Sequence, residues 1–532
     1  MTERYYPVGI QTFRNLINEG YVYVDKTDLM WEMQNKRKYI FLSRPRRFGK
    51  SLLSSTLHSF FAGEKDLFSG LKVMSLEKDW NHYPVIHLDL SVAKGQSSAD
   101  ALKERLTLIL KPYTNEYGAD PEEKTPGGII DGLIQRIYQQ TGLQVVVIID
   151  EYDAPLLDVL HDDDELAKMR DVMQEFYIPL KANEQRIKFC FITGITKFSQ
   201  LSIFSTINNL TNISMWPQFS AICGITEHEL TTTLRKDIER MAESYGVSYE
   251  QMHEKLKMHY DGYHFAKDSE DVYNPFSLFK AFDSKETADY WFDSGTPSFL
   301  IREMKHYRTN IMSLDRMEVP TTAFDQPTED MEDALPILYQ CGYLTIKDYN
   351  PELGTYILSI PNQEVKIGYT KGLLPSYIGL KATDVQMGFA SKFWMALSKD
   401  DIDLAMRELQ AYLAGIPYVE GFKKKLAEAA TAEGFYEYTL YLIFSMLNVY
   451  ARTQVKCAHG RTDIIVFMPD TIYLLELKVN DSAQKALAQI NEKDYAKPYL
   501  TDGRRIMKVG IKFDSESRTI AEWAYEMQQN LR

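Results

Sequence analysis

The stretch that most constrains this chain is YIFLSRPRRFGKSLL, which spans residues 39–53. Its first four residues are apolar or aromatic and predict a short buried strand. A basic turn follows, and Gly49 then opens a segment whose leucines recur at helical spacing. The free N–H groups at a helix start and the helix dipole both favour a bound anion. A strand, a loop and a helix in this order therefore predict a site for the phosphates of a nucleotide.

The residues Gly49-Lys50-Ser51 give this prediction its chemistry. In the P-loop pattern the lysine lies against the β and γ phosphates, and the serine hydroxyl is a ligand of Mg²⁺. The pattern has a glycine five residues before Gly49, where this chain has Arg44. An arginine there implies either a different bend of the loop or additional guanidinium contacts to the anion. An ordinary basic turn before a helix is the alternative.

A second apolar run, QVVVIIDEYD at 144–153, supports the same prediction. Its β-branched residues indicate a central parallel strand that is covered on both faces. Asp150, at the carboxyl end of this strand, is placed to hold Mg²⁺ through water, and Glu151 is placed to orient or deprotonate the attacking water. The alternative is a buried strand followed by a solvated acidic turn.

The surrounding sequence alternates between strands and helices. We expect strands at 84–90 and 187–193, with a helix at 98–110 between them. This alternation predicts a parallel α/β sheet with crossover connections. Thr193, at the end of the last strand, is a candidate sensor of the γ-phosphate, and Lys197 is a candidate for stabilising charge. A purely structural role is the alternative for both.

Four segments together resemble the bacterial and archaeal AAA-ATPase-like family, namely YVDKT, SRPRRFGKSLL, IIDEYDAPLL and FITGITKFS. The loop of that family characteristically reads RPRRFGKS, so the resemblance implies that Arg44 is the family's own variant and that ATP and Mg²⁺ are cofactors. It covers roughly the first half of the chain. The lead-in at 23–27 could then supply part of an adenine pocket, although a surface helix fits those residues equally well. The nucleotide-binding candidates are Arg44, Arg46, Arg47, Phe48, Gly49, Lys50, Ser51, Leu52, Asp150 and Thr193.

A second constellation lies near the C-terminus. Asp463 opens an apolar strand, and Glu476 and Lys478 stand two residues apart on the next strand, so they share one face. Carboxylates on neighbouring strands can bind Mg²⁺ or Mn²⁺, while a lysine can orient or activate water and offset developing charge. Glu437 on the preceding predicted helix could complete the shell, and Gln489 on the following one is available to a phosphate or to water. A solvated strand face is the alternative for Glu-x-Lys.

This pattern resembles the PD-(D/E)XK nuclease superfamily, in the branch often fused to the ATPase-like domain. The run 460–463 matches its second motif and the run 476–478 its third, while Gln489 and Tyr495 approximate the glutamine and tyrosine of the next helix. The tyrosine lies further along than in the usual exonuclease-like spacing. The resemblance implies a metal-dependent nuclease. Across both sites, the catalytic candidates are Glu151, Asp463, Glu476, Lys478, Glu437 and Gln489, and the metal-ligand candidates are Ser51, Asp150, Asp463 and Glu476.

The predicted fold class is α/β, with a P-loop NTPase parallel-sheet domain, a helical middle region and a C-terminal α/β domain of restriction-endonuclease type. The 532 residues favour two to four domains. We place an AAA-ATPase-like P-loop domain at 1–225, a helical and mixed middle region at 226–370, and a helical lead-in with the nuclease-like domain at 371–532. The four cysteines are scattered without metal-ligand spacing, as expected for small core residues in a reducing compartment.

Three functional hypotheses follow. The leading one is an ATP-binding protein, an ATPase, coupled to metal-dependent cleavage of nucleic acid, with DNA as partner and defence or mobile-element processing as the setting. A nucleotide-dependent switch or scaffold that binds without cutting is the second, and an ATPase acting on protein partners is the third. The net charge of −14 argues against a surface coated in nucleic acid but allows a local basic groove. The sequence shows no membrane-spanning run and no signal peptide. We therefore expect a cytoplasmic protein without a membrane partner, and a homo-oligomer is compatible with the sequence.

Overall fold

The computed structural model divides into two compact units, Met1–Val365 and Lys366–Arg532. The three-part division at 225 and 370 stays a prediction, and the two units are taken separately below. The residues that the structure describes are 4–157, 159, 162–196, 209–293, 300, 304, 307, 317–321, 334–368, 385–414, 436, 440, 443–444, 450–457, 460–468, 470–479, 481–514, 517 and 519–528.

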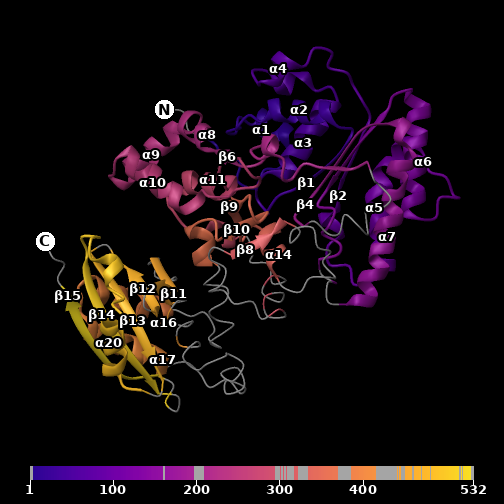
Figure 1. The fold of residues 1–532 in the computed structure, drawn as a ribbon. Helices are drawn as coiled ribbons and strands as arrows, with labels where there is room; N and C mark the ends of the chain where they lie inside the picture. The colour runs from indigo at the N-terminus through magenta and orange to yellow at the C-terminus, as the bar shows by residue number, and fades with distance from the viewer. Residues whose placement is uncertain are drawn as a thin grey trace. The chain divides into compact units, whose positions relative to one another are not determined.

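A parallel sheet forms the centre of the first unit, in the order β2-β3-β4-β1-β5 (Figure 1). Every residue of β1 and β3 is buried, as the apolar runs predicted for strands covered on both faces. The predicted parallel α/β sheet is therefore confirmed. Its strands are β1 (Tyr39–Ser43), β2 (Val85–Asp89), β3 (Val145–Asp150), β4 (Ile187–Gly194) and β5 (Thr211–Asn212).

Helices cover this sheet and supply its crossovers. The helix that follows the phosphate loop, α3, packs against β2, β3 and β4, whereas α5, α6 and α7 lie side by side (Figure 1). The helices of this part are α1 (Phe13–Asn18), α2 (Thr27–Lys36), α3 (Lys50–Phe61), α4 (Val73–Leu76), α5 (Ala99–Tyr117), α6 (Pro126–Thr141) and α7 (Asp163–Ala182).

Beyond β5 the first unit continues as a helical and mixed region. Thr226 caps α8 reciprocally with Glu229, and the helix ends at Thr232, before a second one starts at Arg235. The elements are β6 (Ile225–Thr226), α8 (Glu227–Thr232), α9 (Arg235–Tyr245), α10 (Tyr249–Tyr260), β7 (Val272–Tyr273), α11 (Pro275–Ser284), α12 (Tyr290–Asp293), β8 (Met317–Pro320), α14 (Leu335–Gln340), β9 (Thr345–Asn350) and β10 (Thr355–Ser359).

The second unit is built on a five-stranded sheet in the order β11-β12-β13-β14-β15 (Figure 1). In this sheet, β13–β14 is the one parallel pair among the described strands, and α20 forms its crossover. The strands are β11 (Tyr450–Cys457), β12 (Gly460–Phe467), β13 (Thr471–Lys478), β14 (Arg505–Asp514) and β15 (Thr519–Gln528), and the helices are α16 (Val385–Ser398), α17 (Ile402–Ala414) and α20 (Ala483–Glu492).

Close approach of α20 to the sheet depends on Gly510 in β14. A Cβ at this position would lie 2.2 Å from the Ala483 carbonyl oxygen and 2.6 Å from the Leu487 nitrogen, both backbone atoms of the helix. Because backbone cannot swing aside as a side chain can, only glycine fits here. The contact therefore fixes the height of α20 above the sheet.

We expect Gly510→Ala to destabilise the second unit by about 1–3 kcal/mol, because the added methyl forces α20 away from β14. Thermal unfolding followed by circular dichroism would measure the loss. Gly128→Ala is the matched control, because the nearest atom to its added Cβ lies at an ordinary 3.4 Å. An unchanged unfolding midpoint for Gly510→Ala would contradict the packing argument.

Candidate functional site

The phosphate loop joins the end of β1 to the start of α3. Gly49 precedes the first residue of the helix with φ 92°, a conformation that favours glycine. It is exposed, and apart from Gly49 itself and its two chain neighbours no residue has an atom within 4 Å of the position its Cβ would take. Open space therefore stands over the helix N-terminus, where free N–H groups favour an anion.

The Lys50 side chain binds backbone carbonyls of the phosphate loop. Its Nζ donates to the Arg44 carbonyl at 3.0 Å and to the Pro45 carbonyl at 3.1 Å, and the residue is 5% exposed. The ammonium group is thus held at the centre of the loop by two neutral carbonyls. A phosphate group would offer this cation a stronger, charge-assisted partner in the same place.

Arg44 points into the protein. Its guanidinium donates to the carbonyl oxygens of Ser43, Ser214 and Phe219 at 2.9, 2.8 and 3.0 Å, and the residue is 2% exposed. Burial lowers its pKa. The structure therefore corrects the expectation that this side chain contacts the anion and favours the other alternative, a different bend of the loop held by the arginine.

Arg46, Arg47 and Phe48 of the loop have separate surroundings. The Arg47 guanidinium lies 4.6 Å from the ring centre of Phe276, and its backbone has φ 69°. Arg46 presents its carbonyl to the indole N–H of Trp291 at 3.2 Å. Phe48 is buried at 1% exposure. The two arginines are half-buried, and their contacts with phosphate stay a prediction.

Asp150, at the end of β3, and Ser51, in the first turn of α3, lie beside each other. The Ser51 hydroxyl hydrogen-bonds the Asp150 carboxylate, which also accepts the Glu151 N–H at 3.0 Å. Burial raises the pKa of Asp150, while the Ser51 hydrogen bond and the charge of Lys50 oppose that shift. Both residues line a cavity of about 340 Å³ together with His87 and Asp89 of β2. Two oxygen ligands at the mouth of a cavity suit Mg²⁺.

Glu151 is held in a left-handed conformation, with φ 50°. The carboxylate of Asp153 accepts the N–H groups of Ile195 and Thr196, the second at 2.7 Å, and ties this turn to the end of β4. Gly194 lies directly against the Asp153 carboxylate. A Cβ at this position would be 2.5 Å from Asp153 Oδ1, which is too close for a side chain. Burial raises the pKa of Glu151, while Lys50 lowers it. Our sequence reasoning missed Asp153, although it stands in the same acidic run.

Thr193 does not face the loop. Its hydroxyl donates to the Leu42 carbonyl of β1 at 2.7 Å, and the residue is fully buried. A hydroxyl engaged between two strands is not available to a γ-phosphate, so the structure corrects this expectation to the structural alternative. Lys197 lies outside the described residues.

A second cavity, of about 80 Å³, lies on the other flank of α3. It is lined mostly by apolar side chains from the lead-in, from the P-loop helix and from the region after β5. The lining residues are Pro7, Val22, Tyr23, Val24, Lys26, Phe48, Gly49, Leu52, Leu53, Thr56, Ile222, Cys223, Gly224, Ile225, Pro275 and Phe279.

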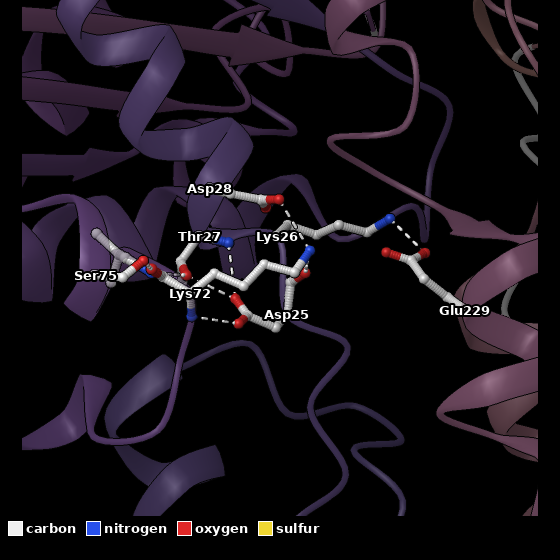
Figure 2. Close-up of polar contacts among 8 residues, drawn as sticks. Asp25, Lys26, Thr27, Asp28, Lys72, Ser75 and Glu229 are labelled. Carbon is white, nitrogen blue, oxygen red and sulfur yellow. Dashed lines mark hydrogen bonds and ion pairs between the residues drawn. The ribbon is translucent and has the colours of Figure 1, made fainter.

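Polar contacts fix the lead-in that forms one wall of this cavity (Figure 2). Lys26 forms an ion pair with Glu229 of α8 at 2.6 Å, and Asp25 accepts the N–H groups of Thr27 and Lys72 at 2.9 and 2.7 Å. The dashed lines in Figure 2 show Lys26 reaching toward Glu229 while Asp25 faces Thr27 and Lys72. Asp25 and Lys26 therefore hold the lead-in to two different parts of the first unit.

In the second unit, Asp463 and Glu476 stand where the pairing of β12 with β13 stops. The ladder ends at Ile464 opposite Leu475, and the next backbone donor, Leu477 N–H, is taken by Asp463 Oδ2 at 2.9 Å. A side chain thus replaces the strand partner. Because the residues across the break continue the register, both carboxylates come to the same end of the strand pair.

Glu476 is 1% exposed, and Lys478, Gln489 and Asp463 are polar neighbours of its carboxylate. Its Oε1 accepts from Lys478 Nζ at 3.3 Å and from the Gln489 amide, which also lies 3.4 Å from the Tyr495 hydroxyl. Its Oε2 is buried without a hydrogen-bond partner among the described residues. Burial and then the charge of Asp463 raise the pKa of Glu476 to about 7, against the opposing Lys478.

Comparison with known proteins assigns a family to each of the two parts of the chain that carry these sites. A family model described as predicted AAA-ATPase matches residues 7–204, and the PD-(D/E)XK nuclease superfamily matches residues 431–523. A curated protein of Azotobacter chroococcum mcd 1, called uncharacterized protein in vnfD 5'region, is 31% identical over 537 residues, covering 99% of each chain. The chain belongs to this AAA-ATPase-like family. Its second unit carries the nuclease-superfamily domain, so both resemblances seen in the sequence are confirmed.

The remaining predictions for this AAA-ATPase-like protein concern Glu437, a membrane span and the metal ligands. Glu437 lies outside the described residues. No helix in the described part of the chain is long and apolar enough to cross a membrane. Within the same part, no group of three or more His, Cys, Asp or Glu side chains is arranged to hold a metal ion. The candidate metal ligands among the described residues of the nuclease-like domain are Asp463 and Glu476. The Oε2 atom of Glu476, which has no hydrogen-bond partner among these residues, fits a metal ligand.

Proposed function

We propose that this protein binds and hydrolyses ATP in its first unit and cleaves nucleic acid, with DNA as the substrate, in its second unit with Mg²⁺ or Mn²⁺. The observation that carries the nuclease assignment is the buried carboxylate of Glu476. One of its oxygens is bonded to Lys478 and Gln489 while the other has no hydrogen-bond partner among the described residues. Leaving a buried carboxylate oxygen unpaired costs free energy, which a bound cation would recover.

In the nucleotide site, Lys50 would bind the β and γ phosphates, and Ser51 with Asp150 would hold Mg²⁺. The bound cation would neutralise charge on the phosphates. Glu151 would orient the attacking water, because its turn is fixed by Asp153 and its carboxylate lies within the field of Lys50. The apolar cavity beside Gly49 and Leu52 would receive the base, for which apolar walls and a few fixed polar groups are suited.

In the nuclease-like domain, Asp463 and Glu476 would hold the metal ion, which supplies a Lewis acid and an activated water when bound. Lys478 would orient that water and offset negative charge on the phosphodiester. Gln489 would keep the Glu476 carboxylate in place from α20. This last role relies on the close approach of the helix at Gly510.

Cleavage of labelled single- and double-stranded DNA by the purified full chain tests the proposal, with Mn²⁺ or Mg²⁺ and with or without ATP. Metal-dependent cutting that ATP alters would support a nucleotide-controlled nuclease. Intact DNA under every condition would overturn the cleavage function for these substrates and favour the switch or scaffold. ATP turnover that nucleic acid does not stimulate would favour an ATPase acting on protein partners. A cytoplasmic location and a homo-oligomeric state stay predictions.

The raised pKa of Glu476 predicts how metal binding depends on pH. A carboxyl group with a pKa of about 7 is protonated below that value, and the proton competes with the cation. As the pH rises toward 7, the affinity for Mn²⁺ should therefore increase by up to about tenfold for each pH unit, and above pH 7 it should level off. Titration calorimetry of the second-unit site, in a chain carrying Ser51→Ala and Asp150→Asn, would measure it. An affinity that stays constant from acidic to neutral pH would contradict the prediction.

A further inference from the structure

The phosphate loop is enclosed by segments that follow it by more than 200 residues in the chain. The Phe48 ring lies 4.7 Å from the ring of Tyr263 and 5.3 Å from that of Phe265, in edge-to-face contacts. Gly342 approaches Pro45 so closely that a Cβ on the glycine would lie 2.6 Å from the Pro45 Cβ. Pro45 and Phe48 are thus packed as tightly as residues of a protein core.

Trp291 of α12 makes a polar contact with this loop. Its indole N–H donates to the Arg46 carbonyl at 3.2 Å, although the two residues are 245 positions apart. The residue is 6% exposed, and its ring lies 4.9 Å from that of Tyr343. An indole has one donor, so this hydrogen bond commits the polar atom of the side chain to the loop backbone.

The backbone of Trp291 is held in turn by the region 334–365, which we call the β9–β10 module. The carboxylate of Glu364, a fully buried residue, accepts the Trp291 N–H at 2.9 Å. The module is anchored nearby, since Lys347 Nζ donates to the Gly262 carbonyl at 2.7 Å and His264 N–H donates to Thr345 Oγ1 at 2.7 Å. A chain of direct contacts therefore runs from the module through Trp291 to the phosphate loop.

We propose that Trp291 is a positioning residue for the nucleotide site, and that it makes the phosphate loop and the β9–β10 module respond together to nucleotide. The inference rests on the proposed nucleotide binding. Lys50 now donates to the carbonyls of Arg44 and Pro45, directly before Arg46 in the chain. When phosphate draws Lys50 away, these carbonyls shift, and the Arg46 carbonyl carries that shift to Trp291 and Glu364.

Trp291→Phe in the full chain tests this inference, because phenylalanine keeps an aromatic ring and removes the indole N–H. We expect the KM for ATP to rise about threefold to tenfold, as the loss of one hydrogen bond allows, with kcat within about twofold of wild type. Hydrogen–deuterium exchange gives the second readout. ATP should slow exchange in both the loop and the module of wild type, but only in the loop of the variant.

The control is Trp394→Phe, because Trp394 is an exposed tryptophan of α16 in the second unit. Glu364→Leu repeats the test from the other end of the contact chain, because it removes the acceptor of the Trp291 N–H, and it decides the question if Trp291→Phe fails to fold. Wild-type protein that binds no ATP would overturn the proposed function and the inference with it. Normal ATP binding, together with variants that match wild type in KM and in module exchange, would overturn the inference alone.

Discussion

Lys50→Ala is expected to lower the rate of ATP hydrolysis by about 10²–10³-fold. A cation placed where negative charge develops contributes on this scale when it is removed. The residue lies at the centre of the phosphate loop, nine-tenths or more buried, with no carboxylate as its direct hydrogen-bond partner in the described contacts. Its charge is therefore available to phosphate rather than neutralised by an ion pair. Phosphate release from ATP by the purified variant would measure the effect.

The matched control is Lys36→Ala, which removes an exposed lysine that pairs with Glu32 on the surface of α2. This variant should hydrolyse ATP at the wild-type rate, since an exposed ion pair contributes little. Thermal unfolding of both variants would check that the fold is retained. Wild-type turnover by a folded Lys50→Ala protein would exclude the phosphate loop as the site of hydrolysis.

Asp463→Asn is expected to lower metal-dependent cleavage by at least about 100-fold. Even the outer partners of metal ligands cost 10–100-fold when they are changed, and Asp463 is proposed as a ligand itself. The substitution keeps an oxygen that can accept the Leu477 N–H, so the break between β12 and β13 should persist. The variant thus removes charge while it preserves shape, and loss of cleavage can be assigned to the site.

Asp481→Asn serves as the control for this change. Asp481 is an exposed carboxylate of the same unit that pairs with Lys485, and its removal should leave cleavage unchanged. Binding of Mn²⁺, measured alongside cleavage, should weaken for Asp463→Asn only. Equal cleavage by both variants would remove Asp463 from the proposed metal site.

The sequence predicted those parts of the two sites that depend on local periodicity. The apolar run before Asp150 specified a buried strand, and its end fixed where the carboxylate meets Ser51. Alternation along β13 likewise placed Glu476 and Lys478 on one face, with 3.3 Å between their charged groups. In both cases, a pattern of a few residues determines the geometry.

Where a residue's role depends on tertiary contacts, the sequence analysis either assigned it a role that the structure corrects or did not identify the residue. Arg44 turns inward because the carbonyls of Ser214 and Phe219, far along the chain, need donors. Thr193 bonds to the neighbouring strand, since a hydroxyl buried inside the sheet takes the nearest carbonyl. Gly510 and Trp291 act through contacts across packed elements. No local pattern marks such residues.

The enclosure of the phosphate loop has a consequence for how the protein is made. The ribosome completes the loop at Phe48, but its packing partner Gly342 is synthesised 294 residues later. At roughly 5–20 residues per second, the nascent loop waits about 15–60 s before its surroundings exist. Fragments that stop at residue 204 lack Ser214, Phe219, Tyr263 and Trp291. The segment matched by the family model therefore lacks part of the packing around the phosphate loop, which is complete only once the chain has been synthesised to the end of the first unit at Val365.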